Sequence, residues 1–158
     1  MEAAEQVAEL LSLVPIVAIQ TSPSHRAMMT VAPLATSLSL SLEPTDDLRE
    51  RALPTVLVED FPRVIHDCWR HPHEEIAGES NIAAQARGLA VLRRVLARYD
   101  GRQVVLSTHG NLLALILNGL DSRIGYEFWR GLSFPDVYRL EFEGGVFASS
   151  RRCWKDAR

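Results

Sequence analysis

The first forty residues alternate between helical and strand-like hydrophobic patterns. Apolar residues recur every three to four positions over 2–13, which predicts an amphipathic helix. The run Ile16-Val17-Ala18-Ile19 is wholly apolar and rich in β-branched residues, as expected of a strand covered on both faces. Ser22 and Pro23 have the character of an N-cap and a first helical residue, so a second helix is predicted over 24–37.

The middle of the chain is less regular until a long helix begins. Prolines and an acidic cluster interrupt the pattern over 38–61, where only short strands are expected, and a short helix is predicted over 61–69. Ser80 is the predicted N-cap of a long helix that Asp100-Gly101 ends. The predicted buried stripe of this helix consists of Ile82, Ala86, Leu89, Leu92, Leu96 and Tyr99.

The last third contains one more buried strand and helix and then two strands of a different kind. A buried strand is predicted over 103–107, followed by a helix over 111–119 that is apolar nearly all round. The alternating run 137–142, the turn Gly144-Gly145 and the run 146–149 predict an antiparallel edge. Alternating strands and long helices predict an α/β fold with three layers, α/β/α, around a mostly parallel sheet.

Composition and charge narrow the class of protein. The 158 residues carry no internal repeat or linker, which predicts a single domain over 1–158. A net charge of −3 favours neither nucleic acid nor an anionic membrane as a partner, and no apolar run approaches the roughly 18 residues of a membrane span. Two widely separated cysteines fit a reducing compartment, so a cytoplasmic location is expected.

Two strand-to-helix junctions carry the residues best suited to chemistry. In open α/β sheets, ligands bind beyond the carboxyl ends of the strands, and Arg26 and His109 follow two predicted strands there. With the first amides of the helix that follows His109, at Gly110 and Asn111, they would form a cradle for phosphate. Pattern alone also allows Arg26 to be a surface residue and His109 a structural one, and it places Glu50 in a solvated charge run.

Four motifs in order resemble those of one family. The segment 22–30 resembles the Ser-Pro-x-x-Arg-Ala-x-x-Thr motif of the histidine phosphatase superfamily, the phosphoglycerate mutase-like proteins. The segments Leu48-Arg49-Glu50, Gly78-Glu79-Ser80 and Thr108-His109-Gly110-Asn111 are similar to its Leu-x-Glu, Gly-Glu-Ser and second histidine motifs.

The resemblance implies a phosphohistidine mechanism acting on a small phosphorylated molecule or inorganic phosphate. In this mechanism Arg26 would bind the phosphoryl group, His109 would stabilise its charge in the transition state, and Glu50 would protonate the leaving oxygen. Gly110 and Asn111 would add contacts to the phosphate, and neither a metal nor a cofactor is expected.

The sequence departs from the family at its start. Family members begin with a central strand ending in Arg-His-Gly, whose histidine takes the phosphoryl group, and this sequence has no such motif. The domain is therefore expected to be N-terminally short, with the first central strand absent. The pair Arg70-His71 follows no buried strand, and His25 should point away from Arg26, so neither is assigned the role. The sheet would close directly, or a second chain would complete it in a homodimer.

Two classes of function follow. An intact form would hydrolyse phosphomonoesters or transfer phosphoryl groups, and the chain as given is expected to be impaired or inactive, a pseudoenzyme. The alternative is a non-catalytic anion-binding or metal-binding domain with a regulatory or interaction role. The metal-binding form would use ligand types that cluster in one loop, namely His66, Cys68, His71, His73, Glu74 and Glu75.

Overall fold

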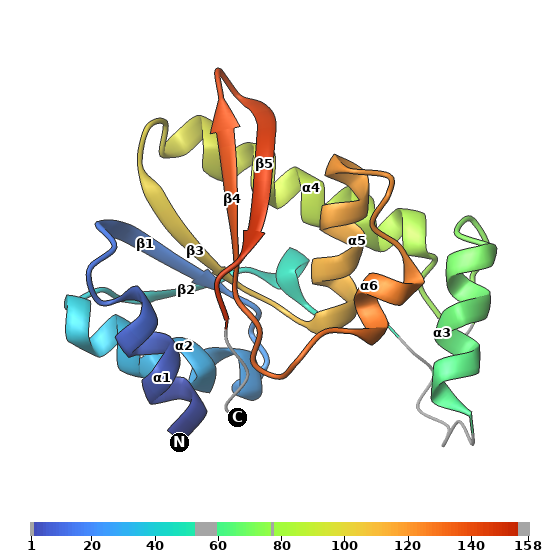
Figure 1. The fold of residues 1–158 in the computed structure, drawn as a ribbon, viewed down its shortest axis with the longest axis horizontal. Coiled ribbons are helices and arrows are strands. Elements are labelled where there is room, and N and C mark those ends of the chain that lie inside the picture. The colour runs from blue at the N-terminus through green and yellow to red at the C-terminus, as the bar shows by residue number, and fades with distance from the viewer. Residues whose placement is uncertain (1, 53–59, 77, 155–158) are drawn as a thin grey trace.

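The computed structural model describes residues 2–52, 60–76 and 78–154. Six α-helices, one 3₁₀ helix and five strands lie in these ranges (Figure 1). In chain order they are α1 (Glu2–Leu11), β1 (Ile16–Thr21), α2 (His25–Leu38), β2 (Leu42–Pro44), η1 (Asp46–Leu48), α3 (Phe61–Arg70), α4 (Asn81–Arg98), β3 (Gln103–Ser107), α5 (Gly110–Leu120), α6 (Tyr126–Arg130), β4 (Tyr138–Glu143) and β5 (Val146–Arg152).

The sheet at the centre of the fold is parallel and its strand order is β2-β1-β3. β1 pairs with β2 from Ile19↔Leu42 onwards and with β3 up to Thr21↔Ser107. Because β1 and β3 are parallel and in this register, their carboxyl ends lie side by side. This edge of the sheet is where the expected site residues follow the strands.

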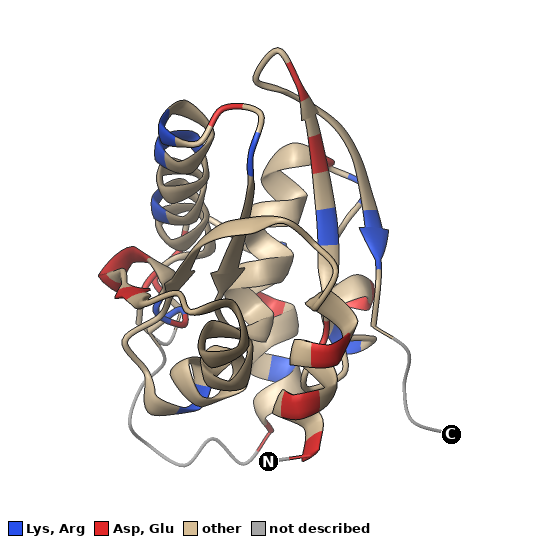
Figure 2. Cartoon of the chain, turned by 90° about the vertical axis from the view of Figure 1, so that its left-hand side faces the viewer, with Lys and Arg blue, Asp and Glu red and all other residues tan. Residues whose placement is uncertain are grey.

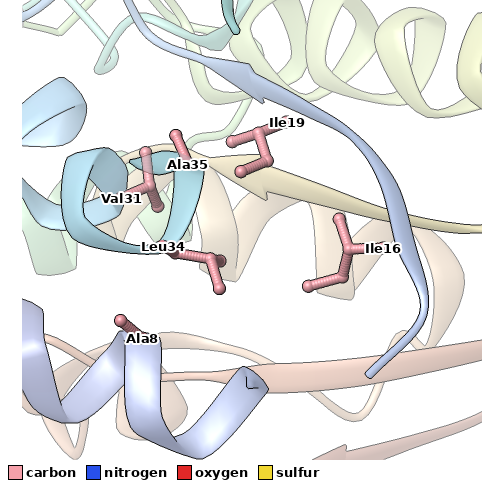
Figure 3. Close-up of a cluster of buried hydrophobic side chains, with 6 residues drawn as sticks. All are labelled: Ala8, Ile16, Ile19, Val31, Leu34 and Ala35. Carbon is pink, nitrogen blue, oxygen red and sulfur yellow. The ribbon is translucent and has the colours of Figure 1, made fainter. Parts of the chain in front are cut away.

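Helices cover both faces of this sheet. On one face α1 and α2 pack against β1 through a buried cluster of Ala8, Ile16, Ile19, Val31, Leu34 and Ala35 (Figure 3). On the other face α4 and α5 share a buried cluster, and Leu106 of β3 packs against it. Leu106 and the next residue back, Val105, contact opposite faces because side chains alternate along a strand. The predicted α/β fold with helices on both sides of a parallel sheet is confirmed.

The N-cap of the second helix lies two residues later than predicted. Its N-cap is Ser24 and its first residue is His25, so Ser22 is not the cap. The hydroxyl of Ser22 is fully buried and accepts a hydrogen bond from the N–H of Ser24 at 3.3 Å. A buried hydroxyl with partners outside the helix is not available to cap it, which the local pattern could not reveal.

The buried stripe of α4 was predicted incorrectly at two positions. Ile82 is exposed, as is Ala86, and the residues that face inward are Ala84, Gly88, Val91, Leu92 and Val95. A Cβ placed on Gly88 would lie 2.6 Å from Cγ1 of Ile116. The small residue therefore lets α5 approach α4 closely, at a position that the predicted stripe did not include.

The predicted antiparallel strands form but do not extend the parallel sheet. β4 and β5 make a separate two-stranded sheet, and within the described ranges β3 is paired with β1 alone. Phe142 of β4 packs instead against the cluster between α4 and α5. Direct closure of the sheet is thus not what the structure shows, and completion by a second chain stays a prediction.

Charge is unevenly distributed over the helices. Figure 2 shows basic residues along α4 and acidic residues on α1. In the part of the chain that the structure describes, no helix has the length and apolar character needed to cross a membrane.

Candidate functional site

The site lies where β1 and β3 end. The N–H of Ser22 donates to the carbonyl of Ser107 at 2.8 Å, which continues the pairing of the two strands by one residue. The chain then turns into α2 after β1 and into α5 after β3. The hydroxyl of Ser107 donates to the carbonyl of Ala27 at 2.9 Å, so the start of α2 is fixed onto β3.

Arg26 and His109 are in direct contact. The Nε–H of Arg26 donates to Nδ1 of His109 at 3.2 Å, and Nε2 of the same ring lies 2.8 Å from the hydroxyl oxygen of Ser22. Because a guanidinium can only donate, Nδ1 must carry the lone pair. The proton of the neutral ring then sits on Nε2 and is donated to Ser22. Both ring nitrogens are therefore engaged, and the tautomer follows from the geometry.

The rest of the Arg26 guanidinium is available to a ligand. Arg26 is exposed, and within the described residues its Nη atoms make no hydrogen bond. It lies in the first turn of α2, which holds no acidic residue. An anion bound there would satisfy the two free nitrogens and complement the positive end of the helix dipole.

Glu50 joins the site from the loop after η1. Its carboxylate accepts hydrogen bonds from the N–H of Leu112 at 3.0 Å and of Asn111 at 3.2 Å, and so caps the first turn of α5. Burial raises the pKa of Glu50, while the N–H groups of Arg51, Asn111 and Leu112 and the charge of Arg26 oppose the rise. A partly buried carboxyl with a raised pKa is suited to donate a proton to a leaving oxygen.

The structure brings Arg26, Glu50 and His109 together. Gly110 begins α5 next to His109, and a Cβ placed on it would lie 3.0 Å from the ring of Phe134. The N–H of Asn111 is already used by Glu50, and the Asn111 side chain is buried with no hydrogen-bond partner in the described ranges. A phosphate that accepted from the N–H of Asn111 would therefore compete with Glu50.

In the described residues, no hydrogen bond joins the other histidines to this cluster. His25 is exposed at the start of α2, and His71 ends α3 with its Nδ1 3.5 Å from a carboxylate oxygen of Glu74. His66 packs edge-on against the ring of Tyr126. Among residues that the structure describes, no three metal-ligating side chains come together, so the metal-binding alternative gains no support.

The comparisons with known proteins agree with this architecture. The family model of the histidine phosphatase superfamily, branch 1, matches residues 1–154. The chain belongs to the histidine phosphatase superfamily. A search of curated proteins gives no match.

Several solved structures share the fold of this chain although their sequence identity to it is low. Phosphoglycerate mutase from Bacillus anthracis superposes with a TM-score of 0.74 at 17% identity, covering 93% of this chain and 76% of that one. Mycobacterial glucosyl-3-phosphoglycerate phosphatase gives 0.73 at 22%, covering 96% and 82%. A phosphoserine phosphatase mutant from Entamoeba histolytica, in complex with phosphoserine, gives 0.73 at 17%, covering 94% and 80%.

The charge state of His109 should make the stability of this histidine phosphatase superfamily member depend on pH. Burial, together with the charges of Arg26 and Arg87, lowers the pKa of His109 from 6.5 to about 4. The unfolded chain therefore binds a proton in this interval that the folded chain does not. The stabilisation is complete above pH 6.5 and is lost as the pH falls toward about 4.

Urea denaturation at a series of pH values tests this expectation against the His109→Gln variant. Titrating groups distant from His109 contribute equally to both proteins, so the difference between the two curves reports on His109 and its immediate contacts. We expect the wild-type free energy of unfolding to fall more steeply on acidification. Parallel curves would contradict the low pKa.

Proposed function

We propose that the Arg26–His109 site binds inorganic phosphate or the phosphoryl group of a small phosphomonoester. The observation that carries the proposal is that Arg26 is held on His109 by its Nε while its Nη atoms make no hydrogen bond in the described residues. A guanidinium fixed in this way is preorganised for two parallel bonds to an anion. In support, the mycobacterial phosphatase of the same fold has been solved with inorganic phosphate and with VO3.

In a catalytically intact site, each of the three clustered side chains would have a separate role in phosphoryl transfer. Arg26 would neutralise the phosphoryl oxygens, and the Nε2–H of His109 would donate to one of them after leaving Ser22. Glu50, whose pKa burial raises, would hold a proton for the departing oxygen. A neutral Glu50 also avoids the repulsion that a carboxylate would exert on a bound phosphate.

We further propose that this chain binds the phosphoryl group without turning it over. A nucleophilic histidine needs a free lone pair directed at phosphorus, and the lone pair of His109 accepts from Arg26. His109 is the one histidine that contacts Arg26 in the described ranges. These contacts support the assignment of His109 as a supporting histidine, and the protein would then behave as a phosphate-binding pseudoenzyme.

Equilibrium binding and a turnover assay on the same preparation test these two statements separately. Calorimetry with phosphate and with vanadate should show one site, whereas hydrolysis of p-nitrophenyl phosphate and phosphoserine should stay at background. The absence of binding would refute the phosphate site. Hydrolysis that His109→Ala abolishes would refute the pseudoenzyme, since another nucleophile must then be present.

A further inference from the structure

We propose that Arg87, on the buried side of α4, is a positioning residue that holds Glu50 in the phosphate site. Arg87 contacts the backbone that carries Glu50 and lies outside the Arg26–His109 contact. The inference rests on the proposed function, because it assigns a role within that same site.

Arg87 binds the segment that ends at Glu50 through hydrogen bonds to main-chain carbonyls. Its Nη1 donates to the carbonyl of Asp47 at 2.6 Å and to that of Arg49 at 2.8 Å, and its Nη2 donates to the carbonyl of Glu50 at 3.2 Å. Carbonyls of successive turn residues diverge, so one planar group with several fixed donors is needed to reach them together. The conformation of the loop is therefore tied to α4.

Glu79 fixes Arg87 in turn. The carboxylate accepts from Nε and from Nη2 of Arg87, each at 2.8 Å, and both side chains are largely buried. Hydrogen bonds from Arg87 lower the pKa of Glu79, which keeps this carboxylate charged. The same carboxylate accepts from the N–H of Ala52 at 3.2 Å, so the pair holds the chain on both sides of Glu50.

The side chain of Glu50 is fixed at the opposite end. Its two oxygens lie on the N–H groups of Asn111 and Leu112, while the hydroxyl of Thr108 donates to the carbonyl of Leu48 at 2.8 Å. The loop is thus attached by hydrogen bonds to α4 on one side and to the start of α5 on the other. Releasing it from Arg87 would let the Glu50 carboxyl leave the site although the hydrogen bond between Arg26 and His109 remains.

Backbone amide titrations observed by NMR test this inference without requiring turnover. In the wild type, the amide signals of Asn111 and Leu112 should shift as Glu50 titrates, because its carboxylate accepts from both. The charge of Arg26 acts on Glu50, the guanidinium of Arg87 lies on the Glu50 carbonyl, and both arginines act on the titration of His109. The Glu50→Gln variant separates the contributions of these groups to the amide shifts from that of Glu50. We expect Arg87→Ala to lose the Glu50-dependent shift of both amides.

Two further variants keep the test decisive. Arg87→Lys keeps a positive charge opposite Glu79 but lacks the planar guanidinium with its several donors, so it should also lose most of the shift. This variant decides the question if Arg87→Ala fails to fold. Arg94→Ala is the matched control, since Arg94 lies on the same helix and its one hydrogen bond to the segment before Glu50, among the residues described, is to the Asp47 side chain at 2.9 Å. This control should keep the full shift.

The outcomes separate the inference from the proposed function. A full Glu50-dependent shift in folded Arg87→Ala or Arg87→Lys would overturn the role of Arg87, and so would an equal loss in Arg94→Ala. Phosphate binding is measured on the same samples, and its absence in the wild type would refute the proposed function while the amide result still decides on Arg87. If the wild type turns over phosphomonoesters, Arg87→Lys should lower kcat by about 100-fold with KM nearly unchanged.

Discussion

Replacing Arg26 with alanine should weaken the binding of inorganic phosphate more than any other single change in the site. Charge-assisted hydrogen bonds contribute about 1.5–3 kcal/mol, so the Kd should rise by roughly 10- to 150-fold. The fold should be little affected, because Arg26 is exposed and the one hydrogen bond of its side chain in the described residues is that to His109. Calorimetry with phosphate and with vanadate measures the change.

Arg98→Ala is the matched control for this loss of one positive charge. Arg98 ends α4, on the side that leads into the start of β3, whereas His109 follows the end of that strand. Its Nη1 lies 3.6 Å from a carboxylate oxygen of Glu43, and its side chain is exposed. Equal weakening in both variants would mean that phosphate responds to overall charge and that Arg26 forms no specific site.

Leu112→Ala should destabilise the fold more than any change among the polar site residues. Leu112 is fully buried in the cluster between α4 and α5, and removing a buried leucine costs about 2–5 kcal/mol, through lost burial and the cavity left behind. Urea denaturation of wild type and variant measures this difference. The N–H that donates to Glu50 is still present in the variant.

The matched control is Leu13→Ala, because the side chain of Leu13 is 96% exposed. The same chemical change there should alter the free energy of unfolding by less than about 0.5 kcal/mol. Comparable losses at both positions would contradict the packing of α5 against α4.

Much of the site could be predicted from the sequence because strand-to-helix junctions have a recognisable local pattern of hydrophobic and polar residues. The buried run before His109 and the apolar helix after it identify β3 and α5, and the position of Arg26 after β1 follows from the same reasoning. Since parallel strands end at one edge of a sheet, the contact between Arg26 and His109 could be anticipated. Glu50 was identified only by the motif resemblance, as its own pattern is that of a solvated loop.

The partners of these residues could not be predicted, because they depend on contacts between distant segments. Ser22 contacts a ring 87 positions away, and Arg87 donates to carbonyls 37 to 40 positions away. Every residue has a main-chain carbonyl, so the sequence does not indicate which carbonyls accept from an arginine side chain. From sequence alone, an arginine on a helix is therefore predicted to be a solvated cation. The five-residue helix α6 was also missed, since it is too short to show a helical period.

The titration of the His109 imidazole by NMR, with and without saturating phosphate, tests the central claim most directly. Without phosphate the ring should be in the Nε2–H form with a pKa of about 4, because burial and the charge of Arg26 disfavour the cation. A phosphate bound to Arg26 places a negative charge beside the ring and should raise that pKa. An unchanged His109 titration in the presence of bound phosphate would contradict the account, since the anion would then lie elsewhere.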